Sequence, residues 1–197
     1  SRITPGGSWP GRREGLLAPD ELTVLLRTFL LTALLVPAAA RAEVQNLSEG
    51  GFVSRHQAEV AATPAAVYRT LTERIDEWWE GAHSWSGDAA NLYFEARVGG
   101  CFCERLENGG GAEHLRVVLL WPNRQVRLEG ALGPLGPMGL AGTMNWVLEE
   151  TGSGGTRFTW TYVVRGHMAG DYAALADAVD AVNGTQFNNL VALAGGI

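Results

Sequence analysis

The chain has 197 residues, a formal net charge of −6, and a composition that is 46% apolar and 18% charged. These values are typical of one ordinary globular domain. All 15 basic residues are arginines and they are scattered, so no basic stripe is present that could follow a phosphate backbone. Nucleic-acid binding is therefore not expected, and the absence of lysine excludes Schiff-base chemistry by this chain.

The N-terminal part of the sequence carries an export pattern. An uncharged apolar run, TFLLTALLV over residues 28–36, follows Arg27 and precedes a small-x-small sequence that ends at Ala42. This order predicts a signal peptide over residues 24–42, cleaved after Ala42, and a periplasmic or secreted mature protein. The run is too short for a membrane-spanning helix, which needs ~20 residues, so no transmembrane segment is expected in the mature protein.

The segments on either side of this signal are predicted to lie outside the folded domain. Residues 1–23 are rich in Gly, Pro and Arg, and we interpret them as a disordered or non-native extension. Residues 43–50 are predicted to be a linker, and residues 51–197 to be the single folded domain.

The domain is predicted to open with one strand and two short helices. Apolar and polar residues alternate over residues 52–60, which is the period of a half-buried strand. Thr63 then offers a helix cap and Pro64 the first helical position, so a helix is expected over residues 65–71. A second short helix is expected over residues 74–79.

The rest of the domain is predicted to be a loop over residues 81–91, a run of hairpins and a closing helix. Tight Gly and Asn turns separate six strands, expected at 92–97, 101–106, 113–120, 125–130, 142–149 and 156–164. Asp171 caps the final helix, which runs to about Leu193. Its apolar stripe at 100° per residue consists of Tyr172, Leu175, Ala176, Val179, Val182, Leu190 and Leu193. Sequential hairpins followed by one amphipathic helix indicate an α+β fold with an antiparallel sheet.

This order of elements resembles the START-like (SRPBCC) helix-grip superfamily, in its chaperone-ATPase-activator-like or polyketide-cyclase-like branch. The matching segments are EVAATPAAVYRTLT, the pair Trp78-Trp79, VGGCFCE, LGPLGPMGLAGTMNW, GTRFT and ALADAVDAVNGTQFNNL, and the resemblance covers residue 51 to the C-terminus. It implies a curved antiparallel sheet of about seven strands around a long C-terminal helix. It also implies an apolar pocket between sheet and helix for a small molecule. The chaperone-activator role fits poorly with an exported protein.

Two cysteines are spaced two residues apart on a predicted strand. The side chains of Cys101 and Cys103 should therefore share one face of the sheet. A disulfide between such neighbours is expected to be strained by their separation, and the C-x-C spacing is not the usual one for zinc. We expect plain packing inside the domain, which by parity turns Glu104 outward, although a redox or metal role is left open.

Candidates for chemistry are few. His83 lies in the 81–91 loop and is a candidate polar or lid group. Glu95 and Glu104 lie on neighbouring predicted strands, and a carboxyl group that faced a pocket could act as a general base. No nucleophile–base pair can be recognised, so the catalytic residues are left unassigned, and no metal or cofactor is expected.

Aromatic and helical residues are the better candidates for a pocket, because small-molecule pockets are lined by apolar and aromatic groups. Asn183 and Gln186 fall inside the apolar stripe of the last helix, where buried amides need partners. The predicted cavity residues are Trp78, Trp85, Phe94, Trp121, Trp146, Phe158, Trp160, Tyr162, Val179, Asn183 and Gln186.

Three functional hypotheses remain from the sequence. The first is an exported module that binds a hydrophobic or lipid-like small molecule. The second is an enzyme of the cyclase, isomerase or dehydratase type, which would use a pocket acid, His83 or Tyr162 for proton transfer. The third is an interaction protein whose cavity is filled by its own side chains. The sequence does not identify the ligand or the oligomeric state.

Overall fold

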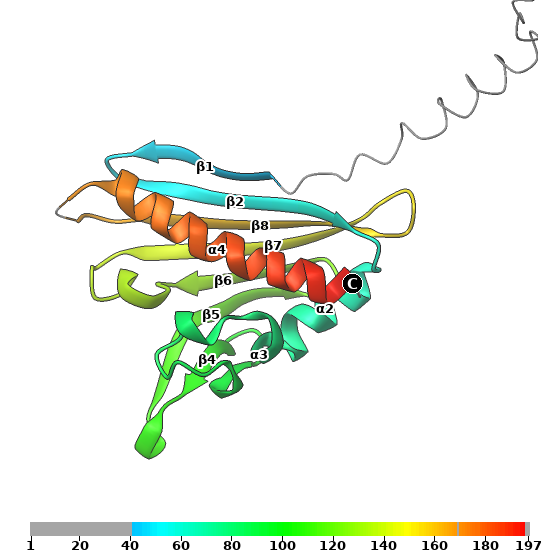
Figure 1. Ribbon diagram of the computed structural model, residues 1–197, viewed down its shortest axis with the longest axis horizontal. Helices are drawn as coiled ribbons and strands as arrows, with labels where there is room; N and C mark the ends of the chain where they lie inside the picture. Colours follow the sequence, from blue (N-terminus) through cyan, green and yellow to red (C-terminus); the bar gives the residue numbers. More distant parts are fainter. Residues whose placement is uncertain (1–40, 169, 196–197) are drawn as a thin grey trace, which may run out of the picture. The chain divides into compact units, whose positions relative to one another are not determined.

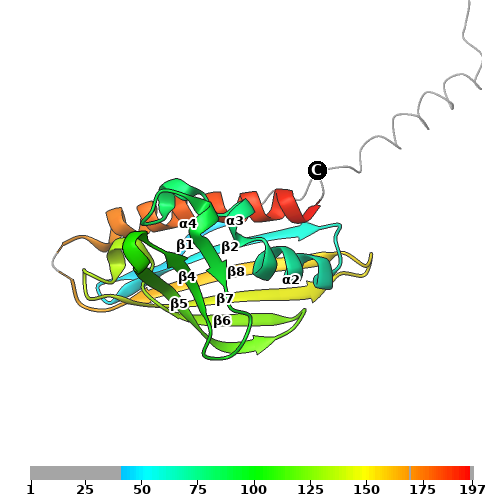
Figure 2. The ribbon, with the colours of Figure 1, turned by 90° about the horizontal axis from the view of Figure 1, so that it is seen from below.

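The fold is a single curved antiparallel sheet with helices on one face, as a computed structural model describes it for residues 41–168 and 170–195 (Figures 1 and 2). Within those residues the strands are β1 Arg41–Ser48, β2 Gly51–Val60, β3 Leu92–Phe94, β4 Cys101–Arg105, β5 Gly111–Trp121, β6 Gln125–Gly130, β7 Ala141–Glu150 and β8 Thr156–Arg165. Their order in the sheet is β1-β2-β8-β7-β6-β5-β4-β3. The helices are α2 Pro64–Glu73, α3 Ile75–Trp78 and α4 Tyr172–Gly195, with short 3-10 turns η1 Gly81–His83, η2 Ala89–Asn91, η3 Glu107–Gly109 and η4 Gly133–Leu135. The predicted α+β helix-grip architecture is confirmed.

The sheet begins earlier in the chain than the sequence indicates. Residues 43–50 were expected to be a linker, but Arg41–Ser48 forms the edge strand β1, which pairs antiparallel with β2 and packs against α4. The described part of the sheet therefore has eight strands, where about seven were expected. The predicted cleavage point after Ala42 falls inside β1. The predicted extension and most of the predicted signal lie outside the described residues, and no helix within those residues is long and apolar enough to cross a membrane.

Helix α2 forms where its capping signals predict it. The Thr63 side chain accepts a hydrogen bond from the backbone N–H of Ala66, and Pro64 occupies the first turn. Val67 and Leu71 on one face of the helix are fully buried in the core. The indole N–H of Trp78 in α3 donates to the Thr70 carbonyl at 3.1 Å, so the two short helices are tied together.

Helix α4 packs against β1 and β2, and from there it runs diagonally across β8 and β7 toward α2 on the helix-covered face of the sheet (Figures 1 and 2). Asp171 caps it by accepting a hydrogen bond from the Ala173 N–H at 2.8 Å, as predicted. Phe187 stacks on Phe158 of β8, with ring centroids 5.4 Å apart. A Cβ atom on Gly184 would lie 3.1 Å from Cε1 of His56, so the glycine permits the close approach of helix and strand.

Candidate functional site

A pocket of about 350 Å³ lies between helix α4, the segment around η4 and the segment around η1. Its walls are mostly apolar, and from α4 and the η4 segment they consist of Leu132, Pro134, Leu135, Leu175, Ala178, Val179 and Val182. Its polar lining includes His83, His114 and Asn183, with Trp85 as an exposed aromatic group. The volume and the apolar lining are in the range of small-molecule sites.

His114 enters the pocket wall because of an irregularity in β5. Phe102 pairs with Leu115, but the next residue, Cys103, pairs with Glu113, so His114 is an extra residue in the β5 strand. Such a β-bulge breaks the alternation of faces and re-aims a side chain. His114 and Leu115 are consequently both buried, and the imidazole stacks on Phe102 at a centroid distance of 4.8 Å.

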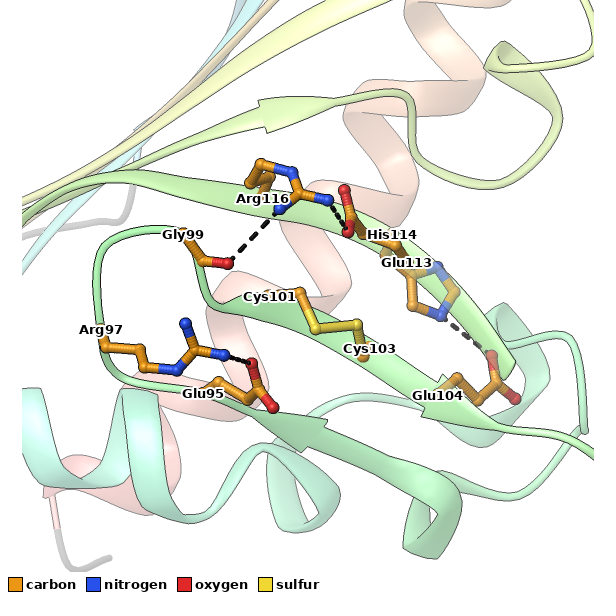
Figure 3. The surroundings of a disulfide bond; sticks show 9 residues. All are labelled: Glu95, Arg97, Gly99, Cys101, Cys103, Glu104, Glu113, His114 and Arg116. Atoms are coloured by element: carbon orange, nitrogen blue, oxygen red, sulfur yellow. Dashed lines mark hydrogen bonds and ion pairs between the residues drawn. A yellow bond between two sulfur atoms is a disulfide. The ribbon is translucent and has the colours of Figure 1, made fainter. Parts of the chain in front are cut away.

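Glu104 lies behind His114 and holds its orientation. The Glu104 side chain is fully buried and its Oε2 atom lies 2.9 Å from His114 Nε2 (Figure 3). The backbone N–H groups of Trp85 and Ser86 donate to the same carboxylate at 3.0 and 2.6 Å. These donors outweigh burial, which alone would raise the pKa of Glu104, so its pKa is lowered and the group is ionised at neutral pH.

The charge on Glu104 determines the tautomer of His114. Burial lowers the pKa of His114, and the attraction of Glu104 only partly opposes this effect, so the imidazole is neutral at pH 7. An ionised carboxylate only accepts hydrogen bonds, so the single imidazole proton lies on Nε2. Nδ1 is therefore an acceptor, and no hydrogen bond to it is present within the described residues. This is the arrangement of a base oriented by a carboxylate.

Cys101 and Cys103 form a disulfide, which corrects the expectation of plain packing (Figure 3). Phe102 and Glu104 face the interior, and alternation places both cysteines on the opposite face of β4. The predicted parity between the cysteines and Glu104 was right, but the assignment of faces was wrong. The Cα atoms of the two cysteines are 5.4 Å apart, which is within the usual range for a disulfide.

A second buried polar network joins β2 to α4. Ser54 donates to Asp180 at 2.6 Å, His56 Nε2 lies 3.1 Å from the same Asp180 oxygen, and Asn183 Nδ2 donates to Ser54 at 3.4 Å. Burial lowers the pKa of His56 despite the nearby Asp180 carboxylate, so this imidazole is also neutral at pH 7. The network holds α4 in register over β2.

The structure places three of the predicted cavity residues, Trp85, Val179 and Asn183, at the pocket, together with the predicted lid group His83. Gln186 is fully buried next to them, where its Oε1 accepts from the Glu80 N–H at 2.8 Å and its Nε2 lies 3.0 Å from His83 Nδ1. The Gln186 amide, which the sequence places in the apolar stripe of the helix, therefore has partners within the protein. Its hydrogen bonds hold the η1 segment against α4.

The other predicted cavity residues lie elsewhere. Trp121 is exposed at the β5–β6 turn, where Arg124 stacks on its ring. The remaining aromatic candidates belong to the packed core and do not line the pocket, namely Trp78, Phe94, Trp146, Phe158, Trp160 and Tyr162. The Tyr162 hydroxyl accepts from the Leu132 N–H at 3.1 Å, and burial raises its pKa to about 12 despite that bond, so it anchors a loop.

Sequence reasoning missed the Glu104–His114 pair. The two residues are ten positions apart, and parity counted from the cysteines turned Glu104 outward. The one sequence signal for the pair was that Glu104 and His114 lie on adjacent predicted strands. The β-bulge that brings the two side chains together cannot be recognised from the sequence. Within the described residues no three His, Cys, Asp or Glu side chains are grouped as metal ligands would be.

The two buried histidines predict an acid-sensitive fold. The pKa values of His56 and His114 are both lowered from 6.5, so the unfolded chain binds protons at a higher pH than the folded protein. Their contribution to stability is complete above pH ~6.5 and declines below it. We expect the melting temperature to fall between pH 7.5 and 5.5, by about 2–4 °C for each kcal/mol lost.

Thermal denaturation followed by circular dichroism at the two pH values checks this expectation. His56→Gln and His114→Gln should each flatten the dependence, whereas His167→Gln, in an exposed loop, should leave it unchanged. A melting temperature that rises on acidification would contradict the assignment.

Comparison with known proteins agrees with this architecture. Residues 52–195 match the family model described as polyketide cyclase / dehydrase and lipid transport. No curated protein sequence gives a significant match.

Three solved structures illustrate the likeness. A protein from Mesorhizobium loti is 19% identical, with a TM-score of 0.52 over 72% of this chain and 95% of that one. A putative uncharacterized protein from Rhizobium leguminosarum is 17% identical, with a TM-score of 0.53 over 81% and 100%. A conserved protein of unknown function from Enterococcus faecalis is 12% identical, with a TM-score of 0.53 over 78% and 76%. At these identities the likeness shows the fold, and the family match over residues 52–195 shows that the chain belongs to the polyketide cyclase / dehydrase and lipid transport family.

Proposed function

We propose that this protein binds a hydrophobic small molecule in the pocket between α4, the η4 segment and the η1 segment. The single observation that carries the proposal is the apolar pocket of about 350 Å³ with a few polar groups at defined places. The family description, which includes lipid transport, supports the same role. The ligand would lie against Leu175, Val179 and Val182 of α4.

An enzymatic role is the second candidate, and the Glu104–His114 pair favours it. A neutral imidazole, held by a buried carboxylate and with Nδ1 free within the described residues, has the form of a general base. Proton removal next to a carbonyl group would suit an isomerase, cyclase or dehydratase. The neighbouring Asn183 and His83 would then position the substrate.

Filling the pocket tests the proposed binding. Ala178→Trp places an indole at the pocket wall, and we expect it to abolish ligand binding with little loss of stability. Ala181→Trp is the matched control, because Ala181 is an exposed alanine of the same helix outside the pocket. Native mass spectrometry of each variant, purified from its own host, would show the retained ligand.

A co-purifying ligand that is kept by Ala181→Trp and lost from Ala178→Trp supports the binding function. Equal retention by both variants places the ligand elsewhere and refutes the proposal. Retention of a chemically altered molecule, with unaltered molecule accumulating only in His114→Gln, favours the enzyme.

We also propose that the protein is exported. The apolar run over residues 28–36 and the small-x-small sequence ending at Ala42 support this. The Cys101–Cys103 disulfide adds support, because disulfides persist in oxidising compartments. Mass spectrometry of fractionated cells should find a mature N-terminus at Glu43 outside the cytosol, and a full-length chain confined to the cytosol would refute export.

A further inference from the structure

The side-chain carbonyl oxygen of Asn183 meets no hydrogen-bond partner in the described part of the chain. The residue is 1% exposed and lines the pocket, and its Oδ1 atom is buried with no partner within the described residues. Its amide orientation follows from its neighbours. Ser54 has one proton and donates it to Asp180, so it can only accept from Asn183, and the Nδ2 group must face it. Oδ1 is therefore an acceptor, and it is enclosed by the protein, so it makes the pocket wall polar without being open to a ligand.

His114 supplies the acceptor that is open to the pocket. Its Nε2–H donates to the ionised Glu104, which leaves the lone pair of Nδ1. Nδ1 makes no hydrogen bond within the described residues, and it is not among the fully enclosed side-chain atoms without partners. It is thus open to a small probe in a residue that lines the pocket.

The electrostatic surroundings oppose an anionic group at this place. The Glu104 carboxylate is buried and negatively charged, and its Oε2 atom lies 2.9 Å from His114 Nε2. No lysine exists in the chain, and among the residues that the structure describes no arginine lines the pocket. His83 and Trp85, which could donate hydrogen bonds, are exposed and have access to water.

On the basis of the proposed binding function, we infer that the pocket selects an uncharged, mainly apolar molecule that carries a hydroxyl or N–H donor. Its donor hydrogen bonds to His114 Nδ1, the acceptor that is open to the pocket, and its apolar body lies along α4. A buried acceptor without a donor is unfavourable, so a ligand that supplies the donor gains affinity over one that does not. A ligand with a free carboxylate is disfavoured, because its oxygen lone pairs would face the Nδ1 acceptor of His114 and its negative charge would approach that of Glu104.

Three probes of the same aromatic body test this inference on the full chain: 2-naphthol, 2-methoxynaphthalene and 2-naphthoate. The first carries a donor, the second replaces it with an acceptor, and the third carries a negative charge. By isothermal titration calorimetry we expect 2-naphthol to bind about tenfold more tightly than 2-methoxynaphthalene, as one hydrogen bond would give. The carboxylate should bind more weakly than either.

Substitutions locate the contact. His114→Phe should reduce the naphthol-to-methoxynaphthalene ratio towards one, while His167→Gln retains it. Circular dichroism establishes that each variant is folded, and if His114→Phe fails to fold, the wild-type ratio alone tests the inference. Equal affinity for naphthol and its methyl ether, or tightest binding of the carboxylate, overturns the inference and leaves the binding function intact. Binding of none of the three overturns both.

Discussion

Replacing Glu104 with glutamine is expected to lower the free energy of unfolding by about 3 kcal/mol. The carboxylate accepts hydrogen bonds from the Trp85 N–H, the Ser86 N–H and His114, and its side chain is fully buried. Glutamine keeps the size but has one acceptor oxygen, so its NH₂ group would face a donor. At least one of these partly buried backbone donors then loses its partner, which costs ~1–3 kcal/mol for each group.

The same substitution should also loosen the segment that carries Trp85. Two backbone N–H groups of that segment are fixed by Glu104, so we expect faster cleavage by a protease near residues 84–88 in Glu104→Gln. Glu113→Gln is the matched control, since Glu113 is an exposed carboxylate paired with Arg116 on the same sheet. Urea denaturation should place the control within about 0.5 kcal/mol of wild type. Equal stability of the two variants would contradict the structural role of Glu104.

The sequence allowed most of the sheet and α4 to be predicted, because their signals are local. The alternation over residues 52–60, the Thr63-Pro64 cap and the Asp171 cap all correspond to the observed elements. β1 was missed because its own sequence carries no clear strand signal. It is an edge strand, and it is held in place by pairing with β2 and by contact with α4.

The candidate site was harder to predict because it depends on non-local geometry. From the sequence, the cysteines were expected to face the interior of the domain. In the structure Phe102 faces the interior instead, and because side chains alternate along β4, Glu104 faces the interior as well. The extra residue in β5 then brings His114 to Glu104. Aromatic residues were poor guides for the same reason, since a core and a pocket use the same side chains, and Trp146 and Trp160 serve the core.

Gly142 to alanine is the second substitution with a large expected effect. Gly142 lies in β7 opposite Gly130 of β6, and a Cβ atom built there would be 2.4 Å from ring and hydroxyl atoms of Tyr162. Tyr162 is fully buried and its hydroxyl is bonded to the Leu132 N–H, so the ring has no free space to move into. We expect a loss of about 3 kcal/mol, at the upper end for overpacking of a core.

The consequence should extend to the pocket, because Leu132 is part of its wall. Displacing the Tyr162 ring detaches the hydroxyl from the Leu132 N–H, and the η4 segment loses its anchor to β8. Ligand affinity should therefore fall together with stability in Gly142→Ala. Gly152→Ala is the control, because Gly152 is an exposed turn residue and no atom of the described residues lies within 4 Å of an added Cβ. Its unfolding free energy should stay within about 0.5 kcal/mol of wild type.

A double substitution separates this steric mechanism from a general weakness of β7. Tyr162→Leu removes the ring that the new methyl group would strike, at the cost of the hydrogen bond to Leu132. If the clash dominates, adding Gly142→Ala to Tyr162→Leu should cost much less than adding it to wild type, which is a coupling of about 1–3 kcal/mol. Additive costs in urea denaturation would mean that the strand itself rejects a side chain at Gly142. In that case, room for the Tyr162 ring would not be the reason for a glycine at position 142.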